Sequence, residues 1–333
     1  MDLIFQTPVA GGPEPGRVYD LFIIGGGPAG LTAALYGSRA GFSAAILEKG
    51  APGGLMATTE RVENCPGCIE GSGADIARQL LQQATKFGAK FGKAEVTDLR
   101  LSTSPMQVIA GSDVYLARAV IVATGSRPRQ LNVPGEKEYW GRGVSFCSTC
   151  DGPFYQGKSV AVVGGGNSAL QEAEFLLRYV SHLTFLQDLD YLTASQVLQD
   201  RVMSHPNVKA ILGTAIRRIV GNGDVRGVEI EDRHSGARSV VPVHGVFIFI
   251  GLLPNSDLVK GQLELDNQGS IIADARLETS VSGVFAAGDI RRGTIKQIVT
   301  AAADGATAAL SAIEWLRSKH TFLPDTARLA AGR

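Results

Sequence analysis

Two Cys-x-x-Cys pairs hold all four cysteines of the 333-residue chain. Cys147 and Cys150 form one pair, and Cys65 and Cys68 form the other. Two thiols at this spacing can close into a small-loop disulfide, and the start of a helix lowers the pKa of one of them to roughly 7 or below. A pair of this kind can alternate between dithiol and disulfide, so the first chemistry that the sequence indicates is electron transfer.

Zinc binding is the competing interpretation of the cysteines, because two Cys-x-x-Cys pairs can make one four-cysteine site. The interval between Cys68 and Cys147 is far longer than the roughly 15 to 20 residues of a zinc ribbon, and the five histidines are scattered. We therefore expect redox use of Cys147 and Cys150, and no metal. For Cys65 and Cys68 two interpretations stay open: a second redox pair, or two small apolar side chains in the core, since free cysteine packs as a hydrophobe.

A glycine-rich fingerprint begins at Gly25, between the apolar run Tyr19–Ile24 and a predicted helix over 31–40. This strand, turn and helix context is what a dinucleotide-binding fingerprint requires. Gly25 permits the tight turn, Gly27 lets the backbone approach a pyrophosphate at the helix N-terminus, and Gly30 allows the helix to pack closely on the strand. The segment predicts a nucleotide-binding module.

A second fingerprint, Gly164-Gly-Gly-Asn-Ser-Ala169, repeats the plan after the predicted strand 159–163. In both modules an acidic residue follows the next strand at about the spacing where a ribose hydroxyl is bound. These residues are Glu48 in the first module and Asp188 in the second. One fingerprint alone is weak evidence, but two in full context indicate an internal duplication.

The chain returns to its first module after building the second. The predicted strand 118–125 ends in a small-residue turn, and another apolar strand over 281–289 ends in Gly-Asp. We predict an α/β protein with two Rossmann-like, three-layer ββα nucleotide-binding domains, the second inserted in the first. The first domain is expected to comprise residues 1–125 and 254–333, and the inserted domain residues 126–253.

Composition argues against several classes of partner. Lys and Arg together number 32 and so do Asp and Glu, so no long-range field attracts nucleic acid or an anionic membrane surface. No apolar run reaches the roughly 20 residues of a membrane span. The start of the chain has no basic residue and only a short apolar run, which argues against a signal peptide. We expect a cytoplasmic protein.

Taken together, the motifs resemble the low-molecular-weight thioredoxin reductase family, the class II FAD-dependent pyridine nucleotide-disulfide oxidoreductases, over about residues 18 to 318. Between about residues 159 and 318 the sequence is also similar to that of the flavoprotein subunit of alkyl hydroperoxide reductase. The motifs that carry the resemblance are Gly25–Gly30, Gly53-Gly54, Glu63-Asn64, Ala123–Gly125, Cys147–Gly152, Gly164–Ala169, Gly251-x-x-Pro254-Asn255 and Gly288-Asp289.

The resemblance implies an FAD domain built from both ends of the chain and an inserted nucleotide domain that carries the dithiol, joined by a two-stranded hinge. By the same resemblance, Cys150 is the sulfur that faces the flavin, Cys147 attacks the protein disulfide, and Asp151 protonates the leaving thiolate. The residues expected to hold FAD are Gly25, Gly27, Pro28, Ala29, Gly30, Glu48, Gly54, Asn64, Ala123, Thr124, Gly125, Gly288, Asp289, Lys296, Gln297 and Ile298.

The second nucleotide site departs from the family pattern. NADPH-dependent members carry His-Arg-Arg after the second strand of the second nucleotide-binding module. This chain has Gln187-Asp188-Leu189 at that place. A carboxylate repels a 2′-phosphate and accepts a hydrogen bond from a free ribose hydroxyl, so NADPH is disfavoured and NADH or a second FAD is expected. Ferredoxin-linked and diflavin members also exist, and a vestigial site is a further possibility. The residues assigned to this site are Gly164, Gly166, Asn167, Ser168 and Asp188.

These observations predict a flavin-dependent disulfide oxidoreductase that reduces a thioredoxin-like protein disulfide through FAD and the Cys147/Cys150 dithiol. The resemblance also implies a homodimer. Two alternatives stay open. One is a flavin oxidase or an electron donor of a peroxide-reducing system in which the dithiol is auxiliary, and the other is a redox sensor without turnover.

Overall fold

The computed structural model describes residues 11–59, 62, 64–68 and 71–319. The chain divides into two compact units. Unit 1 comprises Met1–Arg127 and Leu253–Arg333, and unit 2 comprises Pro128–Leu252. Each unit is built on a parallel sheet with helices on one face and antiparallel strands on the other, so the predicted fold class is confirmed.

The sheet of unit 1 has the order β3-β2-β1-β6-β5-β4, with β17 paired to β6. Strands β1, β2, β3, β6 and β17 run parallel, whereas β4, β5 and the first half of β6 form an antiparallel meander. The strands are β1 (Val18–Ile24), β2 (Ala44–Glu48), β3 (Lys90–Lys93), β4 (Asp98–Arg100), β5 (Met106–Ala110), β6 (Asp113–Val122) and β17 (Val284–Ala286).

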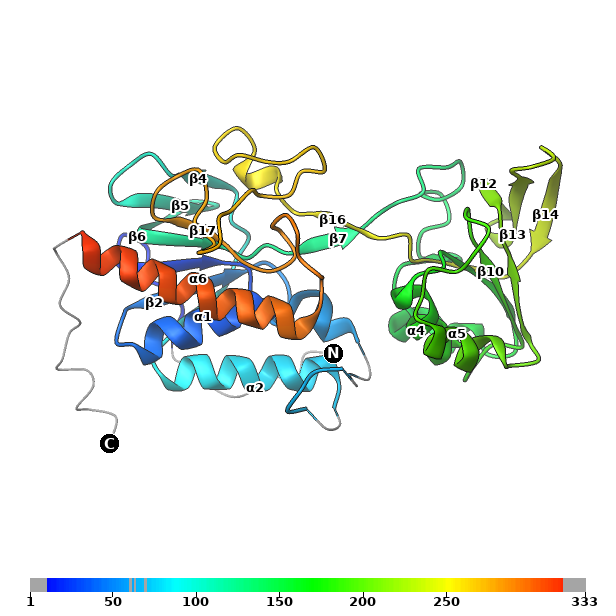
Figure 1. Cartoon of the computed structure of the whole chain (residues 1–333), viewed down its shortest axis with the longest axis horizontal. Coiled ribbons are helices and arrows are strands. Elements are labelled where there is room, and N and C mark those ends of the chain that lie inside the picture. The colour runs from blue at the N-terminus through cyan, green and yellow to red at the C-terminus, as the bar shows by residue number, and fades with distance from the viewer. Residues whose placement is uncertain (1–10, 60–61, 63, 69–70, 320–333) are drawn as a thin grey trace. The chain divides into compact units, whose positions relative to one another are not determined.

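Helices α1 (Pro28–Arg39), α2 (Gly73–Lys86) and α6 (Ile298–Ser318) lie on one face of this sheet (Figure 1). Strand β1 is apolar on both faces, as expected for a parallel strand covered from both sides. Leu21 and Ile23 pack with the helices, whereas Phe22 and Ile24 pack with the meander. The first residues after β1 are thereby held between two apolar cores.

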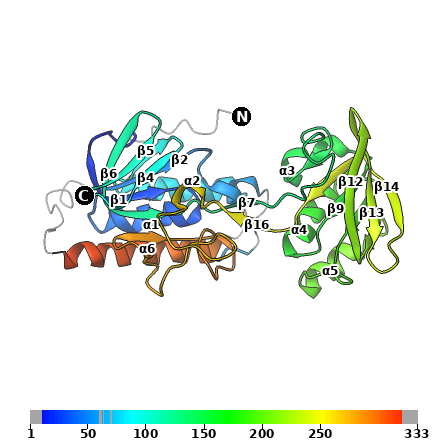
Figure 2. The same cartoon turned by 90° about the horizontal axis from the view of Figure 1, so that it is seen from above.

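Unit 2 repeats this architecture around a parallel sheet of order β11-β10-β9-β15-β8. Helices α4 (Asn167–Leu176) and α5 (Gln196–Met203) cover one face, and the antiparallel strands β12, β13 and β14 cover the other (Figure 2). The strands are β8 (Val144–Ser145), β9 (Ser159–Val163), β10 (His182–Leu186), β11 (Val208–Ile211), β12 (Thr214–Asn222), β13 (Asp224–Asp232), β14 (Arg238–Pro242) and β15 (Gly245–Ile248).

The internal duplication predicted from the two fingerprints is visible in the strand order. The run β3-β2-β1-β6 in unit 1 corresponds to β11-β10-β9-β15 in unit 2, and in each run the glycine turn follows the third strand. The first glycine of each turn also lies close to an equivalent backbone atom. A Cβ on Gly25 would lie 2.3 Å from the carbonyl oxygen of Ala123, and a Cβ on Gly164 would lie 2.3 Å from that of Phe249.

Two short strands pair where the chain passes between the units, β7 (Ser126–Pro128) and β16 (Leu252–Pro254). This agrees with the two-stranded connection that the resemblance implies. The remaining short elements are η1 (Gly54–Thr58), α3 (Ser148–Asp151), η2 (Gly152–Tyr155) and η3 (Asp257–Val259).

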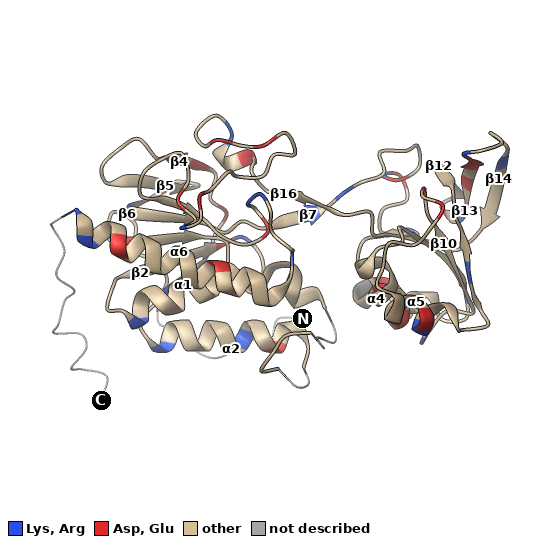
Figure 3. Ribbon diagram, in the orientation of Figure 1, with Lys and Arg blue, Asp and Glu red and all other residues tan. Residues whose placement is uncertain are grey.

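Charged side chains are interspersed in sign over both units (Figure 3). None of the helices in the described part of the chain has the length and apolarity needed to cross a bilayer.

Candidate functional site

The first glycine turn is shaped by contacts that only glycine allows. Gly25 has a φ of +103°, and a Cβ on Gly30 would lie 1.9 Å from the carbonyl oxygen of Gly25. Gly27, by contrast, has open space beside its Cα. The atom nearest to an added Cβ there is the carbonyl oxygen of Gly53, at 4.0 Å. Gly25 and Gly30 therefore close the turn, while Gly27 leaves room for a ligand to approach the backbone.

Helix α1 begins directly after this turn, with Gly27 as its N-cap and Pro28 in the first turn. The cap forms no side-chain hydrogen bond, and no acidic residue lies in the first turn. The first N–H groups of a helix have no partner within the helix, and the helix dipole favours an anion there. Ala29 is buried behind these groups. This helix start has the form of a pyrophosphate site.

Glu48 ends β2 with its carboxylate held by two backbone groups. Its Oε2 accepts the N–H of Gly26 at 2.7 Å, and its Oε1 accepts the N–H of Gly50 at 2.7 Å. Each carboxylate oxygen can accept a second hydrogen bond. A half-buried, fixed acceptor beside the glycine turn fits the two hydroxyl groups of an adenosine ribose.

The end of β6 is tied to the segment that re-enters unit 1. Thr124 Oγ1 donates to the carbonyl oxygen of Asn255 at 2.9 Å, and Asn255 Nδ2 donates to the carbonyl oxygen of Thr124 at 2.9 Å. Ala123 is buried and Gly125 adopts a φ of +65°. The predicted site residues of this turn are therefore fixed at the same sheet edge as Gly25.

The turn after β17 brings a buried carboxyl to that edge. Asp289 receives a hydrogen bond from Ser126 Oγ at 3.2 Å, and burial raises the pKa of its carboxyl. Gly288 donates its N–H to Asp304 Oδ2 at 3.1 Å, and Asp304 also forms a two-pronged ion pair with Arg291 at 2.6 and 2.7 Å. The sequence analysis did not identify Asp304, which lies in the middle of α6 and has no motif around it.

The start of α6 forms the remaining part of the predicted flavin site. Gln297 is the N-cap of α6, and its Oε1 accepts a hydrogen bond from Asn64 Nδ2 at 2.9 Å. Lys296 is exposed with a φ of +59°, and Ile298 packs against the small apolar cluster of Met56, Val62, Ile76 and Ala77. Gly54, with a φ of +55°, approaches Gly27, whose Cα would lie 3.6 Å from an added Cβ.

These residues of unit 1 fit the adenosine and pyrophosphate parts of FAD. Most of them follow the carboxyl ends of the parallel strands β1, β2, β6 and β17, which meet at one edge of the sheet. Ligands of open α/β sheets bind outside this edge. The fit rests on three observations: the open face at Gly27, the uncapped start of α1 and the fixed carboxylate of Glu48.

The second glycine turn, in unit 2, shows the same features. Gly164 has a φ of +116°, Gly166 is the N-cap of α4 without a side-chain hydrogen bond, and Ser168 is exposed. Asn167 Oδ1 accepts the N–H of Ser195 at 2.7 Å, which fixes the loop beside the turn. Asp188 is exposed just beyond β10.

Two basic residues that the sequence analysis missed, Arg233 and His234, contact the loop that follows β10. Arg233 Nη1 donates to the carbonyl oxygen of Asp188 at 3.5 Å, and His234 Nε2 contacts Asp190 Oδ1 at 2.8 Å. The hydrogen bond and charge of Asp190 raise the pKa of His234. Both residues belong to the turn between β13 and β14, so no local signal linked them to β10.

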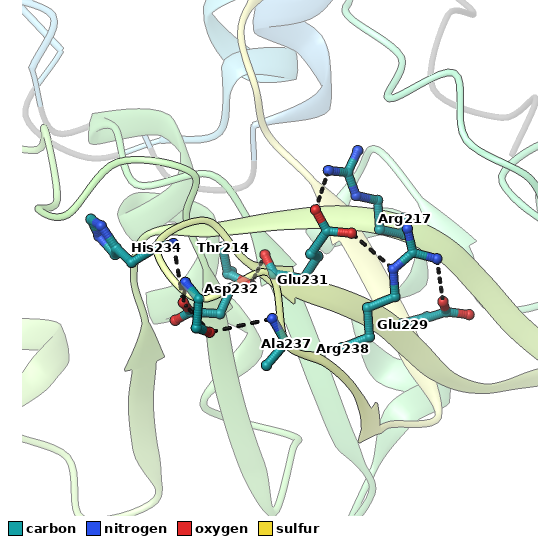
Figure 4. A network of polar contacts seen from close by, with 9 residues as sticks. Thr214, Arg217, Glu229, Glu231, Asp232, His234, Ala237 and Arg238 are labelled. Atoms are coloured by element: carbon teal, nitrogen blue, oxygen red, sulfur yellow. Dashed lines mark hydrogen bonds and ion pairs between the residues drawn. The ribbon is translucent and has the colours of Figure 1, made fainter.

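Figure 4 shows His234 and Asp232 at this turn, beside a network of ion pairs further along the same strands. Glu231 pairs with Arg217 and with Arg238, and Arg238 also reaches Glu229. The network links β12, β13 and β14, and β13 and β14 flank the turn that carries Arg233 and His234.

The predicted dithiol lies at the start of α3. Cys147 is disulfide-bonded, and its N–H donates to Ser145 Oγ at 3.0 Å. The Thr149 hydroxyl lies 3.3 Å from Cys147 Sγ. The side chain of Cys150 lies outside the described part of the chain. Asp151 is half-buried, and its N–H donates to the carbonyl oxygen of Cys147 at 3.2 Å.

A buried carboxyl lies against α3 that sequence reasoning did not single out. Glu172 of α4 accepts the N–H of Ser148 through its Oε2 at 3.3 Å, and burial raises its pKa. Its position within the helix after the second fingerprint gave no indication of this contact.

Two dinucleotide-binding folds and a disulfide-bonded Cys147 within a Cys-x-x-Cys sequence define a class of protein, the nucleotide-dependent disulfide oxidoreductases. Residues 19–305 match the family model described as pyridine nucleotide-disulphide oxidoreductase, and the chain belongs to this family. The prediction of a disulfide oxidoreductase is therefore confirmed.

Thioredoxin reductases are among the similar proteins. The chain is 42% identical over 304 residues to thioredoxin reductase of Listeria monocytogenes, which covers 90% of this chain and 94% of that protein. It is 43% identical over 296 residues to thioredoxin reductase of Bacillus subtilis, and this match covers 89% of this chain and 94% of that protein. The crystal structure of Lactococcus lactis thioredoxin reductase matches with a TM-score of 0.88 and 34% identity, covering 90% of this chain and 99% of that chain.

Proposed function

We propose that the chain reduces the disulfide of a thioredoxin-like protein, with FAD held in unit 1 and the dithiol of Cys147 and Cys150 in unit 2. The observation that carries the proposal is the disulfide-bonded Cys147 at the start of α3, in a chain whose two units both carry a glycine turn followed by a helix without a side-chain cap. The names of the similar proteins in Listeria and Bacillus support the substrate class.

FAD bound in unit 1, once reduced by the electron donor, would supply the electron pair that reduces the disulfide of Cys147 and Cys150 to the dithiol. The thiolate of Cys147 then attacks one sulfur of the protein disulfide, and the sulfur that leaves takes a proton from Asp151. Cys150 attacks the sulfur of Cys147 in the mixed disulfide, which releases the second thiol of the substrate. The dithiol is oxidised by two electrons, the substrate is reduced by two, and water reprotonates Asp151.

This reaction can be tested with purified protein, a reduced electron donor and oxidised thioredoxin. We expect one new thiol pair on thioredoxin for each electron pair supplied, and loss of this activity in both Cys147→Ser and Cys150→Ser. If oxygen consumption is rapid and survives Cys150→Ser while thioredoxin is not reduced, the protein is instead a flavin oxidase or a peroxide-system donor. If the thiol state alters partner binding and no turnover occurs, it is a sensor.

We further propose that the second site takes NADH or a second FAD in preference to NADPH. Asp188 follows β10 where the adenosine ribose would lie, and a carboxylate there accepts a hydrogen bond from a free 2′-hydroxyl and repels a 2′-phosphate. Arg233 favours the other outcome, because its guanidinium supplies positive charge beside the same loop, to which His234 adds when it is protonated. Asp188 lies two residues beyond the end of β10, in the loop that follows the strand.

The donor can be identified by anaerobic titration with NADH, NADPH and reduced ferredoxin, after the flavins per chain have been counted from the absorbance spectrum. We expect NADH to reduce the flavin faster than NADPH, or two FAD molecules per chain. If NADPH reduces the flavin faster than NADH does, and Arg233→Ala removes this preference, then the proposal that Asp188 selects a ribose with a free 2′-hydroxyl is wrong. Reduction by ferredoxin alone would place the protein with the ferredoxin-linked members.

The resemblance also leads us to propose a homodimer in the cytoplasm. Light scattering of the purified protein tests the dimer, and fractionation of cells tests the location.

A further inference from the structure

The second cysteine pair, Cys65 and Cys68, is not used by the function proposed above. Both cysteines are free, and both are half-buried in unit 1. They belong to a loop whose ends are joined by a hydrogen bond from the N–H of Val62 to the carbonyl oxygen of Gly71 at 3.0 Å. The pair therefore lies at the tip of a closed loop.

The backbone between the two cysteines is a tight turn. The N–H of Cys68 donates to the carbonyl oxygen of Cys65 at 3.0 Å, and Gly67 has a φ of +89°. Pro66 followed by a glycine of positive φ is the sequence of a type II turn. A turn of this kind keeps the Cα atoms of its first and last residues within about 7 Å, and a disulfide spans Cα atoms about 4.4 to 6.8 Å apart. The loop thus meets the main geometric requirement for a disulfide before any bond forms.

The loop is also fixed by its neighbours. Cys65 and Cys68 pack against a small apolar cluster formed by Met56, Val62, Ile76 and Ala77. Asn64, the residue before the pair, donates to Gln297 Oε1 at 2.9 Å. A loop that is closed at its base and held on one side loses little further freedom when a disulfide closes, which favours oxidation.

Neither core packing nor metal binding accounts for the pair. Cysteines that serve only as core residues are among the most completely buried side chains, whereas these two are partly exposed. Among residues 11–59, 62, 64–68 and 71–319, no group of three or more His, Cys, Asp or Glu side chains could hold a metal ion. Two partly exposed thiols on a disulfide-compatible turn remain.

We propose that Cys65 and Cys68 are a second redox site, a dithiol that closes reversibly into an intramolecular disulfide by exchange with a disulfide substrate. One sulfur, as thiolate, attacks the external disulfide and releases the first thiol. The other sulfur loses its proton and attacks the mixed disulfide, which releases the second thiol. The pair is oxidised by two electrons, the external disulfide is reduced to two thiols, and the two protons end on those thiols.

The surroundings of Cys65 affect the reactivity of its sulfur. Burial raises the pKa of the Cys65 thiol, and its hydrogen bond to Cys68 and the charge of Cys68 raise it further. A raised pKa makes the thiolate of Cys65 scarce at neutral pH. Attack by Cys65 should therefore accelerate as the pH rises towards and beyond the ordinary thiol value of 9.0.

The sequence allows both cysteine pairs to be followed separately in the intact protein. Trypsin cleaves after Arg61 and Arg78 and yields a peptide of residues 62–78 that contains Cys65 and Cys68. Cleavage after Arg142 and Lys158 yields a peptide of residues 143–158 that contains the other pair. The full-length protein is equilibrated in mixtures of oxidised and reduced dithiothreitol, quenched with acid, alkylated and analysed by mass spectrometry.

We expect the 62–78 peptide to lose both alkylation sites together at the oxidising end, with a mass two hydrogens below that of the dithiol, and to regain them on reduction. In Cys68→Ser, incubation with glutathione disulfide should leave one glutathione on Cys65, because the closing partner is absent, and raising the pH should increase this adduct. A 62–78 peptide that stays doubly alkylated in buffers that fully oxidise the 143–158 peptide overturns the proposal. Loss of one alkylation site without the other overturns it as well.

The result does not depend on the function proposed for Cys147 and Cys150. If the 143–158 peptide fails to cycle or the protein binds no flavin, the proposed function fails, and the 62–78 peptide still reports on the second pair.

Discussion

At the scale of single residues, the candidate site is built from side chains held by backbone groups. Glu48 is fixed by two N–H groups and Asp289 by a hydroxyl, while Glu172 holds the first N–H of α3. A group fixed in this way loses little freedom when a ligand binds, so each contact with the ligand contributes more to affinity. The following predictions depend on individual carboxyl groups.

Glu48→Gln should weaken FAD binding. The amide offers one acceptor oxygen in place of two, so one of the N–H groups of Gly26 and Gly50 loses its partner and the ribose loses a charged acceptor. Hydrogen bonds to charged groups contribute about 1.5 to 3 kcal/mol each, so we expect roughly 10- to 100-fold weaker binding. Titration of the flavin-free protein with FAD, followed by fluorescence, measures this change.

The matched control for this variant is Glu95→Gln. Glu95 lies in the same unit, is exposed and pairs with Lys49 at 3.6 Å. Equal FAD affinity in the two variants would contradict the role of Glu48.

Glu172→Gln should change how the stability of unit 2 depends on pH. Burial raises the pKa of Glu172 above its ordinary value of 4.5, so the folded protein holds this proton at pH values where the unfolded chain has released it. The free energy of unfolding therefore falls as the pH rises above 4.5, by about 1.4 kcal/mol for each unit of pKa separation. The glutamine variant lacks this loss, so its stability relative to the wild type should increase with pH.

Urea denaturation at a series of pH values tests this sign, with Glu174→Gln as the control. Glu174 lies on the same helix and pairs with Arg201 at 3.1 Å at the surface. A wild-type stability that rises with pH relative to Glu172→Gln would contradict the burial argument.

At the scale of elements, two strand, glycine turn and helix modules position everything else. The sequence predicted both modules because their signals are local. Tyr19–Ile24 lies within β1, and the strand predicted at 159–163 is β9 as observed. The predicted helix over 31–40 begins three residues earlier, at Pro28, because proline is well suited to the first turn of a helix.

The contacts that sequence reasoning missed are all between elements. Asp304 reaches Gly288 and Arg291 from the middle of α6, and Arg233 reaches Asp188 from a hairpin far along the chain. Such contacts depend on how the elements pack, and a periodic pattern of apolar residues does not specify which polar side chains will meet. The strands, glycine turns and helices of the two modules could be predicted, but the polar contacts between elements could not.

Gly25→Ala should destabilise unit 1 strongly. An added Cβ would lie 2.3 Å from the carbonyl oxygen of Ala123 on top of the strain of a φ of +103°, so we expect a loss of more than about 3 kcal/mol. Gly111→Ala is the matched control, because Gly111 has a φ of +61° but no atom within 4 Å of an added Cβ. It should cost roughly 1 to 2 kcal/mol from backbone strain alone. Equal losses of unfolding free energy in urea would show that the close approach at Gly25 does not matter.

At the scale of the whole molecule, the two units have separate apolar cores. The cores on the two faces of the unit 1 sheet share no residue with those of unit 2. Ligands that bind a folded unit stabilise it by mass action. The units should therefore respond separately to the ligands proposed for each.

Calorimetry of the flavin-free protein should give two transitions, of which FAD raises one. At a free concentration 100 times its Kd, a ligand stabilises the unit that binds it by about 2.7 kcal/mol. A nicotinamide nucleotide that occupies unit 2 should raise the other transition. A single transition that either ligand shifts in full would contradict independent units.

The central claim is that an electron pair passes from the flavin to Cys147 and Cys150 and then to a protein disulfide. The most direct test is a single-turnover experiment without oxygen, in which FAD-loaded protein is reduced, mixed with oxidised thioredoxin and quenched, and the thioredoxin thiols are counted. The account predicts two thioredoxin thiols for each electron pair in the wild type, and in Cys147→Ser no thioredoxin thiols and a flavin that stays reduced. Thioredoxin thiols that form equally in Cys147→Ser would contradict it.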